Sequence, residues 1–133
     1  MVPKPEPHPT PAYILIVEDE VLIRVVLADQ LRGAGFSVIE ASRADEVLTY
    51  LKAGGHADLV FSDIQMPGSL NGLQLARQLR QDYPALPIIL TSGNISARGV
   101  EGLGLFLSKP YDLEEATALI HYALGLEPPG SAE

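Results

Sequence analysis

Short runs of β-branched and apolar residues alternate with stretches of helical spacing along most of this chain of 133 residues. Five runs have the length and composition of strands: Tyr13–Val17, Ser37–Ala41, Leu59–Ser62, Pro87–Thr91 and Leu105–Ser108. Five stretches between and after them have helical periodicity: 20–34, 43–53, 70–82, 95–102 and 112–124. Because the runs are apolar on both faces, we expect a parallel sheet covered by helices on both sides. The predicted fold is α/β, a (βα)₅ doubly wound sheet of five parallel strands.

The two ends of the chain differ in composition from this alternating part. Proline occupies positions 3, 5, 7, 9 and 11, which favours an extended segment outside the core. We therefore expect a proline-rich flexible tail at residues 1–12, one domain at 13–125 and a C-terminal tail at 126–133. The initial methionine and the two tails favour a complete chain with a single domain.

Composition narrows the possible functions. The chain has no cysteine, which excludes disulfides and thiolate metal sites. Its formal net charge of −8 argues against direct binding of nucleic acid. No apolar run reaches the roughly 18 residues of a membrane span, and no signal peptide precedes the domain. We expect a cytoplasmic protein that neither inserts into a membrane nor binds nucleic acid.

Charged and hydroxyl side chains stand where four of the predicted strands end. Glu18 and Asp19 follow the first strand, Asp63 follows the third, Thr91 ends the fourth and Lys109 follows the fifth. The carboxyl ends of parallel strands share one edge of the sheet, where ligands bind in such folds. Carboxylates brought together repel one another unless a cation such as Mg²⁺ joins them. A lysine and a threonine hydroxyl suit phosphoryl oxygens, so Asp63 is the candidate nucleophile for a phosphoryl group.

These positions resemble a known family. The chain is similar to the receiver domain of two-component response regulators, a flavodoxin-like fold, over about residues 12–125. The residues that carry the resemblance are Glu18-Asp19, Asp63, Met66-Pro67, Gly72, Thr91-Ser92 and Lys109-Pro110. Each motif alone is weak, but all of them in order, at the ends of the expected strands, are highly specific.

The resemblance implies a role for each residue near the sheet edge. Asp63 is the expected phosphoacceptor, which forms an acyl phosphate. Glu18, Asp19, Asp63 and the backbone carbonyl of Gln65 are the expected ligands of Mg²⁺, and no other cofactor is expected. Lys109 is expected to pair with the phosphoryl oxygens, and its peptide bond to the following proline is expected to be cis.

The resemblance also implies a switch and partners. Thr91 is the expected switch hydroxyl, and Phe106 occupies the position of the rotating aromatic residue. The expected donor is a phosphohistidine on a sensor histidine kinase or a phosphotransfer protein. The output is expected to be contact with a downstream protein or onward phosphotransfer, and the sequence does not identify the downstream protein. Such a domain is a signalling phosphoacceptor and not an enzyme in the ordinary sense, since it at most catalyses its own phosphorylation and dephosphorylation.

Two other functions remain as alternatives. A degenerate receiver would act as an unphosphorylated protein-binding module, although the expected site residues are all present. A phosphatase with an aspartate nucleophile would need a second acid two residues after Asp63, where Gln65 stands.

Two segments depart from the family pattern or leave a question open. The segment from Thr91 to Lys109 is about one helical turn shorter than is usual in the family and is rich in glycine. We therefore expect a short or irregular fourth helix. In the first helix, Val21, Leu22 and Val25 lie beside the predicted core stripe. They indicate either a docking patch or a wide core face, and the sequence favours neither.

Overall fold

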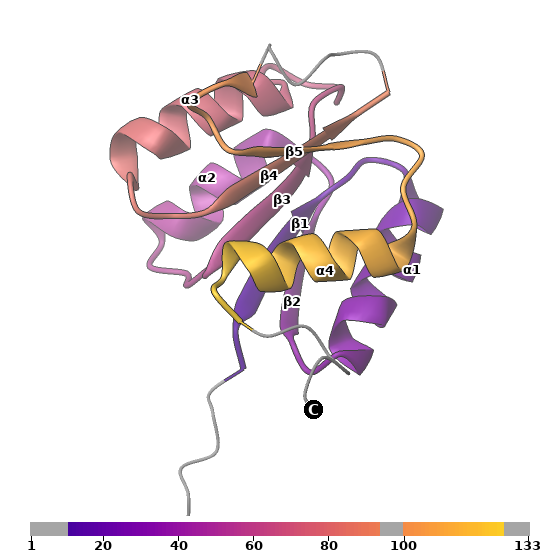
Figure 1. Cartoon of the computed structure of the whole chain (residues 1–133). Helices are drawn as coiled ribbons and strands as arrows, with labels where there is room; N and C mark the ends of the chain where they lie inside the picture. The colour runs from indigo at the N-terminus through magenta and orange to yellow at the C-terminus, as the bar shows by residue number, and fades with distance from the viewer. Residues whose placement is uncertain (1–10, 94–99, 127–133) are drawn as a thin grey trace, which may run out of the picture.

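The computed structural model describes residues 11–93 and 100–126, which form a parallel sheet with helices on both faces (Figure 1). The strands are β1 (Tyr13–Val17), β2 (Ser37–Ala41), β3 (Leu59–Asp63), β4 (Ile88–Ser92) and β5 (Leu105–Ser108). The helices are α1 (Val21–Gly33), α2 (Ala44–Lys52), α3 (Gly72–Asp82) and α4 (Leu113–Ala123). The strand order is β2-β1-β3-β4-β5, and every neighbouring pair is parallel. The predicted doubly wound sheet of five parallel strands is therefore confirmed.

The alternation of side chains along each strand explains why helices cover both faces. Leu15 and Val17 of β1 pack with the buried side chains of α2 and α3, whereas Ile14 and Ile16 pack with those of α1 and α4. Figure 1 shows the same division, with α1 and α4 on one face of the sheet and α2 and α3 on the other. Successive residues of a strand point to opposite faces, so a central strand needs an apolar residue at every position.

The strand order places a crevice at one edge of the sheet. The chain passes from β1 outward to β2, then returns to the other side of β1 to form β3. The connections after β1 and β3 therefore diverge, and the space between them opens at the carboxyl ends of these strands. Candidate functional residues that follow β1 and β3 lie at this point.

The observed boundaries differ from the predicted ones by a single residue in two strands. β3 extends to Asp63, and β4 runs from Ile88 to Ser92 instead of from Pro87 to Thr91. The reason is that Asp63 pairs with Thr91 in the sheet register, and the Ile64 N–H donates to the Thr91 carbonyl at 2.9 Å. Backbone pairing thus continues up to the acidic residue.

Most of the predicted fourth helix, residues 95–102, lies outside the described residues. The described end of this segment is a turn, in which the Leu103 N–H donates to the Val100 carbonyl at 2.9 Å. Across the two described ranges, no helix is both long and apolar enough to cross a membrane.

Candidate functional site: an acidic cluster that faces a lysine

Three carboxylates meet at the crevice between β1 and β3. Glu18 and Asp19 follow β1, Asp63 ends β3, and one carboxylate oxygen of each lies within 4.8 Å of those of the others. They meet because Val17 pairs with Ser62 in the sheet, so that Glu18 and Asp63, which follow these two residues, lie side by side. Glu18 and Asp63 are nearly buried, at 3% and 6% exposed, and Asp19 is more exposed.

Lys109 reaches this cluster from the far edge of the sheet. Its Nζ lies 3.1 Å from Glu18 Oε1 and 3.3 Å from Asp63 Oδ2. The backbone N–H of Lys109 donates to the Ser92 carbonyl at 3.0 Å, which extends the pairing of β4 with β5 and aims the side chain across β4. The peptide bond between Lys109 and Pro110 is cis, as predicted.

The cluster carries more negative than positive charge, and its pKa values reflect burial. Burial raises the pKa of the Glu18 carboxyl above its ordinary value, although the Glu20 N–H and the Lys109 ammonium act against this rise. Burial also raises the pKa of Asp63, to which the charge of Asp19 adds and which Lys109 opposes. Burial alone would lower the pKa of Lys109, but its hydrogen bond to Glu18 and the charge of Asp63 raise that pKa overall.

The donor set of the cluster fits a hard divalent cation. It consists of carboxylate oxygens only, and three carboxylates face the single ammonium of Lys109. Mg²⁺ prefers oxygen ligands and takes few carboxylates together with water and phosphate oxygens. Glu18, Asp19 and Asp63 can hold such an ion, which would also offset the desolvation that raises the pKa values of Glu18 and Asp63.

Gln65, whose backbone carbonyl is the fourth predicted metal ligand, lies two residues after Asp63. Its side-chain Oε1 accepts a hydrogen bond from Ser92 Oγ at 2.8 Å, so the side chain crosses from the loop after β3 to the end of β4. That bond does not use the backbone carbonyl of Gln65. Gln65 lines a surface pocket together with Asp19, and its side chain is hydrogen-bonded to the end of the neighbouring strand β4.

The two predicted switch residues lie at different distances from the cluster. Thr91 is buried, at 1% exposed, and pairs directly with Asp63 in the sheet. Phe106 pairs with Leu90 on the next strand and packs, partly buried, on the α2 and α3 side. Of these two residues, Thr91 is therefore the one adjacent to Asp63, the candidate phosphoacceptor.

Gly72, the first residue of α3, has a physical reason to be glycine. A Cβ at this position would lie 2.2 Å from the Asp63 carbonyl oxygen and 2.7 Å from Ile64 Cα. The Gly72 N–H donates to the Ile64 carbonyl at 2.9 Å, which holds the start of α3 against the strand end. The absence of a side chain at Gly72 thus allows α3 to begin in contact with the backbone of Asp63 and Ile64.

Arg24, which was not predicted from the sequence, also contacts this site. Arg24 Nη1 donates to the Glu18 carbonyl at 2.8 Å, and Arg24 Nε lies 3.3 Å from Glu40 Oε1. The signal in the sequence was a lone arginine within an apolar stretch of α1, four residues after Glu20. Glu40 lies in β2, one residue before the end of that strand.

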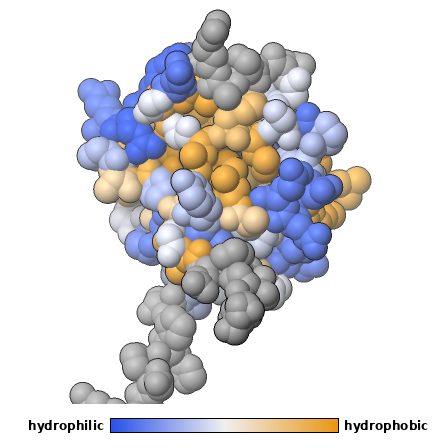
Figure 2. Space-filling model, in the orientation of Figure 1, coloured by the Kyte–Doolittle hydropathy of each residue, from blue (hydrophilic) through white to orange (hydrophobic). Residues whose placement is uncertain are grey.

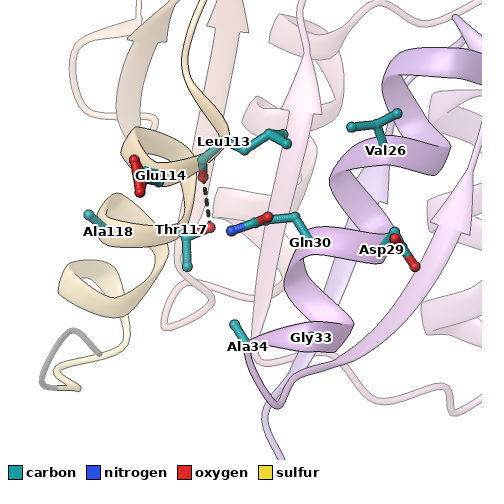
Figure 3. A pocket seen from close by; sticks show the side chains of 9 residues that line it. All are labelled: Val26, Asp29, Gln30, Gly33, Ala34, Leu113, Glu114, Thr117 and Ala118. Carbon is teal, nitrogen blue, oxygen red and sulfur yellow. Dashed lines mark hydrogen bonds between the residues drawn. The ribbon is translucent and has the colours of Figure 1, made fainter. Parts of the chain in front are cut away.

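A separate groove of about 630 Å³ lies between α1 and α4. Figure 3 shows that its walls carry Gln30 and Asp29 on one helix and Glu114 on the other. The Thr117 hydroxyl turns back to donate to the Leu113 carbonyl at 2.7 Å, so it serves its own helix (Figure 3). This groove holds no member of the acidic cluster.

Comparison with known proteins agrees with this geometry. A family model described as the response regulator receiver domain matches residues 14–121. The DNA-binding transcriptional regulator NtrC of Salmonella typhimurium is 35% identical over 116 residues, which make up 84% of this chain and 24% of NtrC. This chain therefore spans about a quarter of that relative.

Solved structures of receiver domains are also similar to this chain. The crystal structure of the receiver domain of the hybrid histidine kinase CckA shares 33% identity and a TM-score of 0.73, over 85% of this chain and 99% of that one. A response regulator receiver protein of Sinorhizobium medicae shares 27% identity and a TM-score of 0.80, over 86% and 95% of the two chains. With an acidic cluster, a facing lysine and a buried threonine on this fold, the chain belongs to the family of response regulator receiver domains of two-component systems.

Proposed function

We propose that this chain is a phosphoacceptor of a two-component phosphorelay that receives a phosphoryl group on Asp63 in a Mg²⁺-dependent reaction. The observation that carries the proposal is the placement of Asp63 between two further carboxylates and the Lys109 ammonium. The donor is a phosphohistidine on a sensor histidine kinase or a phosphotransfer protein. The receiver domain occupies residues 13–125, with tails at 1–12 and 126–133.

The reaction is an in-line displacement at phosphorus. A carboxylate oxygen of Asp63 attacks the phosphorus, the bond from phosphorus to the histidine nitrogen breaks, and the imidazole leaves with the electron pair. The product is an acyl phosphate on Asp63. When bound by Glu18, Asp19, Asp63 and the Gln65 carbonyl, Mg²⁺ supplies positive charge for the phosphoryl oxygens.

Lys109 and Thr91 act on the transferred group. Lys109 Nζ contacts Asp63 at 3.3 Å, which is close enough for the ammonium to pair with an oxygen of a phosphoryl group on that carboxylate. The Thr91 hydroxyl belongs to the residue that pairs with Asp63 in the sheet, so it lies within a short movement of the same group. Positioning and neutralisation of charge therefore supply most of the catalysis.

Phosphorylation signals through Thr91 and Phe106. Movement of Thr91 toward the phosphoryl group shifts the end of β4, and Phe106, which pairs with the preceding residue Leu90, repacks in response. Phenylalanine has no hydroxyl, so the change is one of packing alone. Figure 2 shows apolar surface between α3 and α4 over β5, where such repacking alters the face offered to a downstream protein.

The apolar side of α1 is the docking surface for the phosphohistidine protein. Val21, Leu22, Val25 and Val26 are 59%, 79%, 48% and 50% exposed, so these side chains form a surface patch and not a wide core face. Between the Leu22 side of α1 and the loop after Lys109 lies an apolar groove of about 580 Å³. A helical partner seated there brings its histidine to the mouth of the cluster.

An unphosphorylated binding module is not favoured. Such a module has no need to keep a buried carboxylate pair beside a lysine, because burial of charge is costly without a function. Here Glu18 and Asp63 remain buried together at that cost.

The test is Mg²⁺-dependent modification by acetyl phosphate, followed by intact mass. We expect a gain of one phosphoryl mass, which EDTA and Asp63→Asn both abolish. Asp82→Asn is the matched control, since Asp82 is an exposed aspartate at the far end of α3. Absence of modification by acetyl phosphate and by a panel of phosphohistidine proteins, together with unchanged NMR spectra on addition of Mg²⁺ and beryllofluoride, would refute the proposal.

A further inference from the structure

We infer that Arg24, held in place by Glu40, is a positioning residue for the loop that carries the metal ligands Glu18 and Asp19. The inference rests on the proposed function, because it concerns the Mg²⁺ site. It assigns a role in that site to a side chain of α1 and to one of β2, an edge strand that contributes no carboxylate to the cluster itself.

Arg24 donates two hydrogen bonds to the loop between β1 and α1. Its Nη1 donates to the carbonyl of Glu18 at 2.8 Å, and its backbone N–H donates to the carbonyl of Glu20 at 3.0 Å. The side chain is 17% exposed, so it lies against the protein. The side chain thus holds the Glu18 end of the short loop, whereas the bond to Glu20 is the ordinary backbone bond of the first helical turn.

The hydrogen bond from Arg24 to the Glu18 carbonyl is the one that orients the metal ligands. That carbonyl belongs to the peptide unit that joins Glu18 to Asp19, and the orientation of this unit sets the direction of both side chains. Elsewhere the loop is held by the Glu18 N–H to the Ala41 carbonyl at 3.0 Å and by the Glu20 N–H to Glu18 Oε2 at 3.1 Å. Neither bond uses the peptide unit between the two metal ligands.

Glu40 fixes the arginine. Its Oε1 lies 3.3 Å from Arg24 Nε, and its Oε2 lies 3.1 Å from Arg32 Nη2. A guanidinium can donate in two fixed directions at once, here to a carbonyl and to a carboxylate, which a lysine ammonium on a flexible stem does not reproduce. Glu40 also neutralises a positive charge that would otherwise oppose a metal cation nearby.

Positioning and simple electrostatics predict opposite effects of removing Arg24. If its charge alone mattered, Arg24→Ala would remove a cation near the acidic cluster and strengthen Mg²⁺ binding. If it positions the peptide between Glu18 and Asp19, the same change weakens binding, because the ligands must then be ordered by the metal itself. The sign of the change therefore decides between the two.

Arg32 supplies a matched control. It lies on the same helix, pairs with the same Glu40 and donates to the Val38 carbonyl at 3.1 Å. In the bonds that the structure describes it contacts no residue of the metal-ligand loop. Arg32→Ala thus removes an arginine, an ion pair with Glu40 and a bond to a carbonyl, as Arg24→Ala does, but leaves the Glu18 peptide held.

The experiment measures Mg²⁺ affinity by isothermal titration calorimetry on the full chain, with thermal unfolding in EDTA as the measure of folding. We expect Arg24→Ala to weaken Mg²⁺ binding about 10-fold, the size seen when partners that orient metal ligands are removed. Arg24→Lys should recover only part of this loss, and Arg32→Ala should stay within about twofold of the unmodified chain. Glu40→Gln, which leaves α1 intact, should weaken binding less than Arg24→Ala does.

A combined variant tests whether Glu40 acts through the arginine. Glu40→Gln should have no further effect on Mg²⁺ affinity in the Arg24→Ala background, because residues that act through one contact are not additive. Mg²⁺ affinity that is unchanged or higher in Arg24→Ala, or that falls equally in Arg32→Ala, would overturn the inference alone. An unmodified chain that binds no Mg²⁺ would overturn the proposed function and this inference with it.

Discussion

Lys109 Nζ lies 3.3 Å from Asp63 Oδ2, although β4 separates β3, which ends at Asp63, from β5, which Lys109 follows. The same ammonium contacts Glu18 at 3.1 Å, so it neutralises part of the charge of both carboxylates at once. A lysine in this place compensates the cluster before any phosphoryl group arrives and is then in position to pair with one.

Replacement of this lysine should slow phosphorylation while leaving the fold intact. Lys109→Met keeps the length of the side chain but removes the charge that stabilises the transferred group. We expect the rate with acetyl phosphate and Mg²⁺ to fall about 100-fold, the size seen when one preorganised electrostatic partner is lost. Lys52→Met, at the exposed end of α2, is the matched control, and equal rates in the two variants would contradict the prediction.

The raised pKa values of Asp63 and Glu18 predict how stability depends on pH without metal. A carboxyl whose pKa is higher in the folded than in the unfolded chain binds more protons when folded. Its contribution to stability is therefore lost as pH rises from the ordinary value, 3.8 for Asp63 and 4.5 for Glu18, through the folded value. Asp63→Asn removes this penalty.

In EDTA at pH 7, we therefore expect Asp63→Asn to unfold at a higher urea concentration than the unmodified chain. The difference should shrink as pH falls through the raised pKa of folded Asp63 and disappear below 3.8, where Asp63 is neutral in both states. Saturating Mg²⁺ should reverse the order, because the variant lacks one metal ligand. A variant that is less stable than the unmodified chain at pH 7 in EDTA would count against a raised pKa of Asp63.

Gly72 and Gly33 should respond in opposite ways to the same substitution. Gly72→Ala places a Cβ 2.2 Å from the Asp63 carbonyl oxygen, whereas a Cβ at Gly33 meets no atom within 4 Å. We expect Gly72→Ala to lower the free energy of unfolding by about 1–3 kcal/mol and to slow phosphorylation, since α3 must move from the strand end. Gly33→Ala should be neutral or stabilising by up to about 1 kcal/mol. Urea unfolding of both variants checks this, and equal losses of stability would contradict it.

The sequence was sufficient to predict the sheet and the placement of the acidic cluster, because both follow from local patterns. Strand and helix periodicity separate cleanly in this chain, and parallel strands bring their ends to one edge. Glu18, Asp63 and Lys109 therefore came together as expected.

Other features depend on tertiary contacts that no local pattern contains. The hydrogen bond from Arg24 to the Glu18 carbonyl joins a side chain of α1 to the backbone of a loop. Glycine is required at position 72 because α3 approaches Asp63 closely. The α1 patch was undecided because an apolar stripe and an exposed patch have the same sequence. The exposure of these side chains in the structure, highest at 79% for Leu22, separates the two.

Leu22 should matter for transfer from a phosphohistidine protein but not for reaction with a small donor. Leu22→Ser removes the most exposed apolar side chain of the α1 patch, next to the groove that reaches Pro110. We expect transfer from the cognate partner to fall about 10-fold, or about 1.4 kcal/mol, as for an apolar anchor in an interface. Modification by acetyl phosphate should be unchanged, since Leu22 is an exposed apolar residue of α1 and offers no group to the metal or to the phosphoryl oxygens.

Tyr122→Ser is the matched control for Leu22, because Tyr122 is similarly exposed, at 73%, but lies near the end of α4. Loss of a large exposed side chain there should leave both donors unaffected. Transfer measured by the decay of phosphorylated partner, with acetyl phosphate modification in parallel, separates the two residues. Equal transfer to the Leu22→Ser and Tyr122→Ser variants would place the docking surface away from α1, since a partner seated on the patch must contact its most exposed member.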